Sequence, residues 1–242
     1  MIRQHVRSGQ SVLVTGPTGS GKSTLLRALY GSWTPERQER EPLYAEESRT
    51  PRVLLRHLLA NLLLSRGRLE GDEGARIASI GELSRFVANA DLHELVALAY
   101  RNVSRDRVVL VLDHLDPAHP KAATMIEAWL EHGPVVLGAQ RAVGVGRVRC
   151  LLPSDAQLGM RPLDTRSIHG IIENLSAELQ LSLDAGDVTT LTRLAAGNPG
   201  RLCLLMRTAT NPRYRTNGGI QWRLVALDVR IREIGDGDQP SE

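Results

Sequence analysis

The chain has 242 residues, a formal net charge of +3, 42% hydrophobic residues and 3% aromatic residues. This length allows one large domain, or a core domain with a smaller appendage, and the mixed charges give only weak evidence for an acidic partner. The cysteines at 150 and 203 have no metal-binding spacing, no signal peptide opens the chain, and polar residues interrupt the apolar stretch 53–64. These features exclude a disulfide framework and a membrane span, and they predict a cytoplasmic protein.

A glycine-rich motif follows the first apolar run and precedes a helical pattern. It fits G-x-x-x-x-G-K-[ST], the pattern of phosphate-binding loops. Glycines let backbone N–H groups approach phosphate oxygens, Lys22 reaches the β- and γ-phosphates, and the Ser23 hydroxyl suits Mg²⁺. The predicted nucleotide-binding residues are Gly16, Pro17, Thr18, Gly19, Ser20, Gly21, Lys22, Ser23 and Thr24.

The segment after the loop helix alternates strand and helix patterns. Residues 42–45 predict a second strand, and Thr50 followed by proline predicts a helix start. Residues 65–76 are rich in Gly, Arg and Glu and predict a flexible insertion, whereas 91–94 resemble a capping box that opens another helix. The amphipathic stripe of the first of these helices consists of Leu54, Leu55, Leu58, Leu59 and Leu62.

A carboxylate follows the most apolar run of the chain. Residues 108–112 are continuously apolar and Asp113 comes next, which is typical of a central parallel strand whose carboxyl end faces a ligand. A carboxylate there would accept a hydrogen bond from Mg²⁺-bound water, so Ser23 and Asp113 are the predicted metal residues. Capping of a turn is the alternative role for Asp113.

A further helix and strand are expected after Asp113. The helix is predicted over 121–132 and ends at a Gly-Pro pair, and the strand over 135–138 ends at Gln140 and Arg141. A polar residue at that strand end would lie beside the γ-phosphate. An ordinary surface arginine is the competing interpretation.

Helices alone are expected in the last third of the chain. Asp164 and Asp187 are predicted to cap two of them, and Asn198 with Pro199 begins a third. Residues 219–234 have both helical and alternating character, and the chain end from 235 is expected to be disordered. The predicted domains are a core at 1–163, a helical lid at 164–211 and a C-terminal extension with a disordered tail at 212–242.

Taken together, these motifs resemble the AAA+ ATPases and their STAND relatives, especially the origin-recognition and transposon-helper branch. The likeness covers roughly residues 9–211. Besides the glycine loop, residues 113–116 are similar to the acidic strand end of these families, 140–141 to their first sensor, and 197–201 to their second sensor. The resemblance implies an α/β P-loop NTPase fold, with a three-layer core, a parallel sheet in the order 5-1-4-3-2 and a helical lid. It also implies ATP and Mg²⁺ as cofactors, with Arg201 aimed at the nucleotide.

One residue departs from the family pattern. His114 stands where most active relatives have glutamate, and imidazole can accept a proton but lacks the same negative field beside Mg²⁺. Slow hydrolysis is therefore expected. The predicted catalytic residues are Lys22, Asp113, His114, Arg141 and Arg201. Other candidates to activate water are Asp116, Glu46 and Glu47. Arg147 and Arg149 lie in the region of an arginine finger, but arginine is too common in this chain to discriminate.

Three functions remain open from the sequence. The first is an ATP-dependent switch or helper that acts with a protein partner or as a homo-oligomer. The second is a nucleic-acid-binding module regulated by ATP, because the stretch 201–232 is rich in arginine and has Asp228 as its single acid; a basic solvated face is the simpler interpretation. The third is a small-molecule kinase with an acceptor pocket in 50–106. A transport ATPase of the ABC type is disfavoured, because no L-S-G-G-Q-like signature precedes Asp113.

Overall fold

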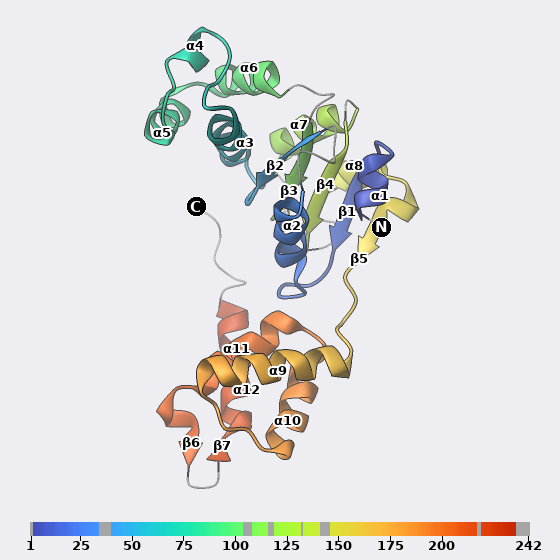
Figure 1. Cartoon of the computed structure of the whole chain (residues 1–242), viewed down its shortest axis with the longest axis vertical. Helices are drawn as coiled ribbons and strands as arrows, with labels where there is room; N and C mark the ends of the chain where they lie inside the picture. Colours follow the sequence, from blue (N-terminus) through green and yellow to red (C-terminus); the bar gives the residue numbers. More distant parts are fainter. Residues whose placement is uncertain are drawn as a thin grey trace. The chain divides into compact units, whose positions relative to one another are not determined.

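The computed structural model describes residues 2–33, 40–103, 108–115, 119–131, 133–140, 146–216 and 219–235. Contacts divide the chain into two units, whose elements are labelled in Figure 1. The first unit comprises residues 1–17 and 22–160, and the second comprises 18–21 and 161–242. The short glycine segment 18–21 therefore groups with helices that lie far along the sequence.

A five-stranded parallel sheet lies at the centre of the first unit, in the order β2-β3-β4-β1-β5. The strands are β1 (Val12–Thr15), β2 (Glu41–Ala45), β3 (Val108–Leu112), β4 (Val135–Ala139) and β5 (Gln157–Gly159). Read from the other edge, this order is 5-1-4-3-2, so the predicted topology is confirmed. Every residue of β3 and β4 is buried, as expected for parallel strands that are covered on both faces.

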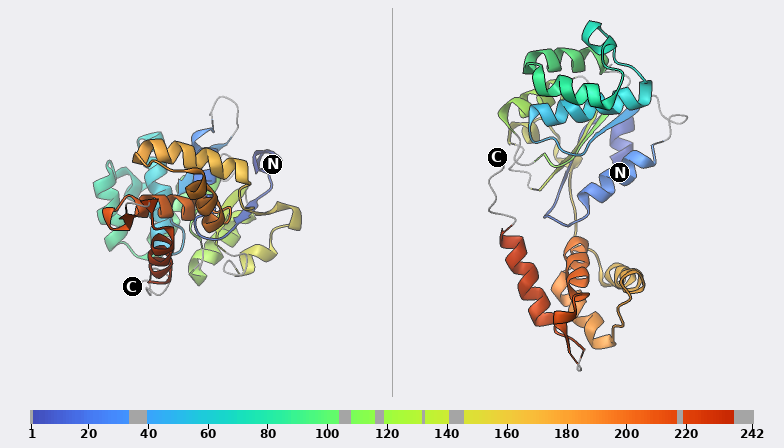
Figure 2. Two further views of the ribbon diagram at one scale, coloured as in Figure 1. Left: turned by 90° about the horizontal axis from the view of Figure 1, so that it is seen from below. Right: turned by 90° about the vertical axis from the view of Figure 1, so that its left-hand side faces the viewer.

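Helices cover both faces of this sheet. Those of the first unit are α1 (Ile2–Arg7), α2 (Lys22–Gly31), α3 (Pro51–Arg66), α4 (Asp72–Ala75), α5 (Ile80–Asn89), α6 (Leu92–Asn102), α7 (Pro120–Leu130) and α8 (Gly146–Cys150), with a short 3-10 turn at Ser154–Ala156. Figure 2 shows α1 and α2, in blue, on the opposite side of the sheet from α3, in cyan. The three-layer arrangement of the prediction is therefore confirmed.

Strand side chains alternate between the two apolar cores on either side of the sheet. In β3, Leu110 and Leu112 join the core that contains the leucines of α3, whereas Val109 and Val111 join the core that contains Leu26 of α2. Successive residues of a strand point to opposite faces, so one apolar run supplies both cores. This is why β3 shows no polar alternation.

The segment between β2 and β3 is a helical layer built on α3. Its leucine stripe is fully buried at Leu58 and Leu62, as the periodicity predicts. The helix begins after Thr50 with proline in its first turn, although the Thr50 side chain makes no capping hydrogen bond. The predicted capping box at Asp91 is present at the start of α6.

The prediction of a flexible insertion at 65–76 is wrong. Leu69 and the adjoining Ile77 are 3% and 4% exposed and belong to the α3 core. Asn102, at the end of α6, fixes the backbone of Glu70: its Oδ1 accepts from the Glu70 N–H at 2.7 Å and its Nδ2 donates to the Glu70 carbonyl at 3.2 Å. A distant amide thus orders a polar stretch that has no periodicity of its own.

The second unit is a helical cluster. Its elements are α9 (Thr165–Leu179), α10 (Ala185–Ala195), α11 (Pro199–Ala209), a 3-10 turn at Pro212–Tyr214, the β6–β7 hairpin (Arg215–Thr216 and Gly219–Ile220) and α12 (Trp222–Gly235). Trp222, Val225 and Val229 of α12 are buried in the same core as Leu202 and Leu205 of α11. The segment of mixed character, 219–234, thus begins with the short strand β7 and continues as the helix α12, which packs with α11. Residues 236–242, where a disordered tail is predicted, lie outside the described residues.

The helix caps of this unit are mostly as predicted. Asp164 caps α9 by accepting from the Ser167 N–H at 2.7 Å. The prediction for α10 is wrong by three positions. Asp184 is the N-cap, and Asp187 closes the capping box from the first turn, because a carboxylate fits both ends of that motif.

Candidate functional site

The glycine loop joins β1 to α2 as the motif requires. Gly19 and Gly21 have φ angles of +78° and +94°, which are favourable only for glycine. The Nζ atom of Lys22 lies 2.8 Å from the Gly16 carbonyl oxygen and 3.1 Å from that of Pro17. The ammonium group is thus folded back over the first residues of the loop, at the start of α2.

Within the second unit, the tip of the loop packs on the start of α11. The Asn198 Nδ2 donates to the Thr18 carbonyl at 2.9 Å, and the Gly200 N–H donates to the Gly19 carbonyl at 2.8 Å. A Cβ on Gly200 would lie 2.5 Å from the Gly19 Cα, so only glycine permits this approach. Arg201 follows directly, with its backbone N–H capped by Asn198 at 3.0 Å.

Asp113 lies at the carboxyl end of β3, and β4 lies between β3 and the strand β1 that leads into the loop. Because β1 and β3 both pair in parallel with β4, the residues that follow them lie at the same end of the sheet, the carboxyl end of the strands. The Asp113 side chain is 1% exposed, and its Oδ1 accepts from the His114 N–H at 2.8 Å. A Cβ on Gly138 of β4 would lie 2.9 Å from Asp113 Oδ1 and 2.7 Å from Leu26 Cδ1 of α2. The carboxylate therefore sits against the helix that begins at Lys22.

His114 adopts a left-handed backbone conformation, with φ +48°, and its side chain is 47% exposed. Its Nδ1 lies 2.9 Å from the Glu46 carbonyl oxygen. A carbonyl can only accept, so Nδ1 carries the hydrogen and the neutral ring has its lone pair on Nε2. This tautomer leaves a proton acceptor next to Asp113.

Tyr44, at the end of β2, is part of the site and was missed by sequence reasoning. Its hydroxyl donates to Asp113 Oδ2 at 3.1 Å. Burial and the Asp113 carboxylate raise the pKa of Tyr44 to about 12, while the Arg27 guanidinium opposes this shift. The hydroxyl is thus protonated near neutral pH and able to donate. No sequence motif includes this tyrosine. The one signal that could have found it is its position near the end of a predicted strand.

The two glutamates after β2 have arginine partners. Glu46 forms an ion pair with Arg27 of α2, and both side chains are about half exposed. Hydrogen bonding to Tyr44 raises the pKa of Arg27, which keeps this cation charged. Glu47 lies 3.8 Å from Arg49. Both glutamates that were candidates to activate water therefore lie beside a cation.

Several predicted residues cannot be located in the site. Arg141 and Asp116 lie outside the described residues, as does the side chain of Arg147. Arg149 is in α8, where its Nε donates to Gln157 Oε1 at 3.1 Å. The roles of these residues stay predictions.

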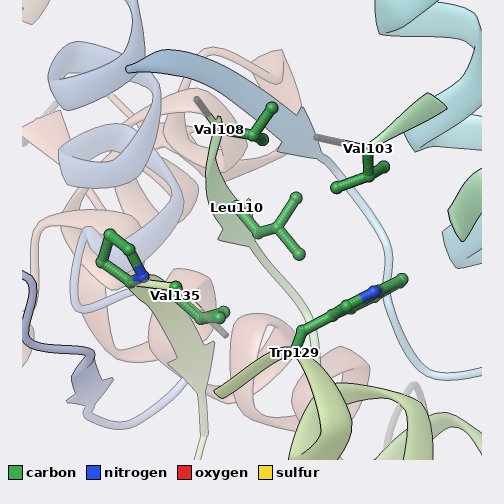
Figure 3. Close-up of a pocket in the computed structure, with 7 residues that line it drawn as sticks. Val103, Val108, Leu110, Trp129 and Val135 are labelled. Carbon is green, nitrogen blue, oxygen red and sulfur yellow. The ribbon is translucent and has the colours of Figure 1, made fainter. Parts of the chain in front are cut away.

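A separate apolar pocket opens at the amino-terminal ends of β3 and β4. Figure 3 shows Val108 and Val135, the first residues of β3 and β4, among the side chains around it. The lining residues are Val103, Val108, Leu110, Trp129, Gly133, Pro134 and Val135. Asp113 follows the opposite end of β3, so this pocket is not the phosphate site.

The residues at the loop fit a nucleotide and its metal ion. Positive-φ glycines at the tip, the Lys22 ammonium and the start of α2 offer donors and positive charge to an anion. Among the residues that the structure describes, no group of three His, Cys, Asp or Glu side chains could hold a metal alone. Mg²⁺ commonly takes one or two carboxylates together with substrate phosphates, which matches a site with Asp113 and Ser23.

The sheet order and the loop between β1 and α2 define a P-loop NTPase. The family described as AAA ATPase domain matches residues 2–140, more than half of the chain. The chain therefore belongs to this family, and it is an AAA+ P-loop ATPase domain. The resemblance stated from the sequence is confirmed at this level.

Solved structures share the fold at low sequence identity. Cdc6p from Pyrobaculum aerophilum is 14% identical with a TM-score of 0.55, over 86% of this chain and 58% of that chain. Domain III of the replication initiation protein DnaA from Thermotoga maritima is 14% identical with a TM-score of 0.55, over 94% and 88%. A point mutant of RuvB from Thermotoga maritima is 14% identical with a TM-score of 0.52, over 99% and 69%. Such identities show the fold alone.

A curated relative shares a shorter stretch. The aliphatic sulfonates import ATP-binding protein SsuB 1 from Nocardia farcinica (strain IFM 10152) is 34% identical over 85 residues, which is 32% of this chain and 33% of that protein. The match thus spans about a third of that relative. In the described ranges, no helix combines the length and apolar character that crossing a bilayer requires.

Proposed function

We propose that the chain binds ATP with Mg²⁺ at the glycine loop and Asp113, and that it works as a nucleotide-dependent switch or helper within a larger assembly. The observation that carries the proposal is that the loop and Asp113 lie at the same end of the sheet: the loop follows β1, Asp113 follows β3, and β4 lies between these strands. A protein partner or a second copy of the chain would bind to the ATP-bound form. Slow hydrolysis of ATP would end this form.

Binding falls to the loop and to the start of α2. Loop N–H groups hold phosphate oxygens, and Lys22 brings a positive charge to the β- and γ-phosphates. The contacts of Lys22 with the Gly16 and Pro17 carbonyls hold its ammonium at the loop. Ser23 and Asp113 would hold Mg²⁺, which would neutralise charge on the phosphates.

His114 is proposed as the residue that accepts a proton from the attacking water. Its Nδ1–H is engaged by the Glu46 carbonyl, so Nε2 has the free lone pair. The carboxylate of Glu46 is less suited, because Arg27 pairs with it. A neutral imidazole supplies no negative field, and turnover is expected to be slow.

Arg201 and Arg141 are proposed to contact the phosphates. For Arg201 the support is its place directly after Gly200, which packs on the loop tip within the second unit. For Arg141 the support is the sequence pattern at the end of β4. Both residues carry a permanent charge suited to phosphate oxygens.

Nucleotide binding by matched lysine variants tests the proposal. Lys22 and Lys121 are the only lysines of the chain, and Lys121 lies in the first turn of α7 with an exposed side chain. Titration calorimetry should show weaker ATP binding for Lys22→Ala and parental binding for Lys121→Ala. Equal ATP affinity in Lys22→Ala and the parent would refute the proposal.

Nucleic-acid binding is a second candidate function, which the charge distribution of the second unit favours. Asp228 pairs with Arg213 and Arg232. Within the described part of the chain, four other exposed arginines of α11, α12 and the hairpin have no carboxylate partner: Arg207, Arg215, Arg223 and Arg230. Cations of this kind would give binding to phosphate backbones that weakens with salt.

A DNA titration tests this candidate. Anisotropy of a labelled duplex should report binding that weakens at least tenfold between about 50 and 200 mM salt. The double variant Arg223→Ala/Arg230→Ala should bind more weakly, whereas Arg85→Ala, an exposed arginine of α5, should match the parent. Binding that is indifferent to salt would exclude the candidate.

A further inference from the structure

Tyr44 is held in place by three elements of the first unit. Its backbone lies in β2, in register with Val111 of β3. Its ring lies 5.6 Å from that of Tyr30 on α2, and its carbonyl accepts from Asn61 Nδ2 of α3 at 3.0 Å. The Tyr30 hydroxyl in turn donates to Asn61 Oδ1 at 3.3 Å. The Tyr44 ring is therefore packed on Tyr30, while its backbone is held by β3 and α3.

The side chain of Tyr44 connects α2 with the end of β3. Its hydroxyl donates to Asp113 Oδ2 at 3.1 Å, and its ring packs on that of Tyr30 of α2. The Arg27 guanidinium of α2 lies near enough to oppose the rise in the pKa of Tyr44, and it is anchored by its ion pair with Glu46. The connection thus runs from α2 through Tyr44 to Asp113.

We infer that Tyr44 is a positioning residue that orients the Asp113 carboxylate for Mg²⁺ and ties it to the helix that begins at Lys22. The inference rests on the proposed function. It assigns a task to a side chain that no motif includes.

The burial of Asp113 makes its donors important. A carboxylate that is 1% exposed needs a donor on each oxygen to be held in one orientation. The His114 N–H serves Oδ1, and the Tyr44 hydroxyl serves Oδ2. The nearest nitrogen of the His114 ring is 3.7 Å from Oδ2, too far for a hydrogen bond. Without the hydroxyl, Oδ2 loses the one donor that the described residues give it.

The matched variants are Tyr44→Phe and Tyr30→Phe. Each removes one hydroxyl and keeps the ring, but only the first hydroxyl contacts Asp113. ATP affinity is measured by calorimetry with Mg²⁺ and with EDTA. Tyr44→Phe should leave the EDTA affinity unchanged and reduce the gain from Mg²⁺ by about tenfold, the lower end of the loss when a partner of a metal ligand is removed. Tyr30→Phe should keep the parental gain.

A second variant keeps the inference testable if Tyr44→Phe is unstable. Arg27→Gln removes the guanidinium from an exposed ion pair beside Tyr44, and it should lower the Mg²⁺ gain relative to the parent, by less than about tenfold. A parental Mg²⁺ gain in Tyr44→Phe, or an equal loss in Tyr30→Phe, overturns the inference. If Lys22→Ala behaves as proposed in those experiments, only the role of Tyr44 falls; if the parent itself gains nothing from Mg²⁺, the proposed metal site falls with it.

Discussion

A side-chain carbon on Gly138 would lie 2.9 Å from the Oδ1 atom of Asp113. The same carbon would lie 2.7 Å from Leu26 Cδ1, so the missing side chain on β4 makes room both for the carboxylate and for the packing of α2. A glycine within a buried strand is costly in backbone entropy, and close approach of another group is a common reason for it.

Gly138→Ala is therefore expected to displace the Asp113 carboxylate. The gain in ATP affinity from Mg²⁺ should fall by about tenfold, as for other losses of orientation around a metal ligand. Calorimetry with Mg²⁺ and with EDTA measures this gain. Gly159→Ala in β5 is the control, because a Cβ there meets nothing within 4 Å. Equal gains in the two variants would contradict the prediction.

His114→Ala is expected to slow ATP hydrolysis by about 100-fold without weakening ATP binding, because proton transfer by a positioned side chain contributes at least that much. Steady-state phosphate release and calorimetry measure the two quantities. His93→Ala, which removes an exposed histidine of α6, should hydrolyse ATP like the parent. Unchanged turnover in His114→Ala would mean that another group activates the water.

Asp228 is expected to make stability depend on pH. The Tyr214 hydroxyl and the cations Arg213 and Arg232 hold the pKa of Asp228 below its ordinary value of 3.8. A carboxylate with a depressed folded-state pKa stabilises the fold above its unfolded-state pKa, and this contribution is lost as the pH falls through the folded-state pKa.

Asp228→Asn should therefore lower the urea midpoint at about pH 7, and the difference from the parent should close at about pH 2. The exposed Asp155 has no ion partner in the described part of the chain, so Asp155→Asn should match the parent at both pH values. A gap between Asp228→Asn and the parent that persists in acid would contradict this origin of the effect.

The leucine stripe of α3 offers a stability test within one helix. Leu58 is fully buried, whereas Leu64 is 73% exposed. Leu58→Ala should lower the free energy of unfolding by about 2–5 kcal/mol through lost burial and a residual cavity, and Leu64→Ala should change it by less than about 0.5 kcal/mol. Denaturant unfolding of both variants checks the prediction, and similar losses would contradict the observed packing.

Local patterns predicted much of the fold and part of the site. The loop glycines, the apolar run before Asp113 and the helical stripe of α3 each show their structure within a few neighbouring residues, because sterics and periodicity act at short range. The order of the strands came from the resemblance to a family.

Contacts between distant segments could not be predicted. Tyr44 reaches Asp113 through the register of β2 on β3, and Gly138 makes room for the same carboxylate from β4. Asn102 orders the backbone at Glu70 across the helical layer, which is why a polar segment that looked flexible is packed. None of these partners is close in sequence, so no window of the chain contains the signal.

The central claim is that the loop and Asp113 at the end of β3 together bind the nucleotide and its metal ion. Crystals grown with Mn²⁺ and a non-hydrolysable ATP analogue test it most directly. Anomalous scattering locates the Mn²⁺ ion without reference to any assumed role. We expect the ion at the Ser23 hydroxyl, with Asp113 bound to it directly or through one water molecule, and the phosphates along the N–H groups of residues 16–24. An ion bound away from Asp113, or phosphates that avoid the loop, would contradict this claim.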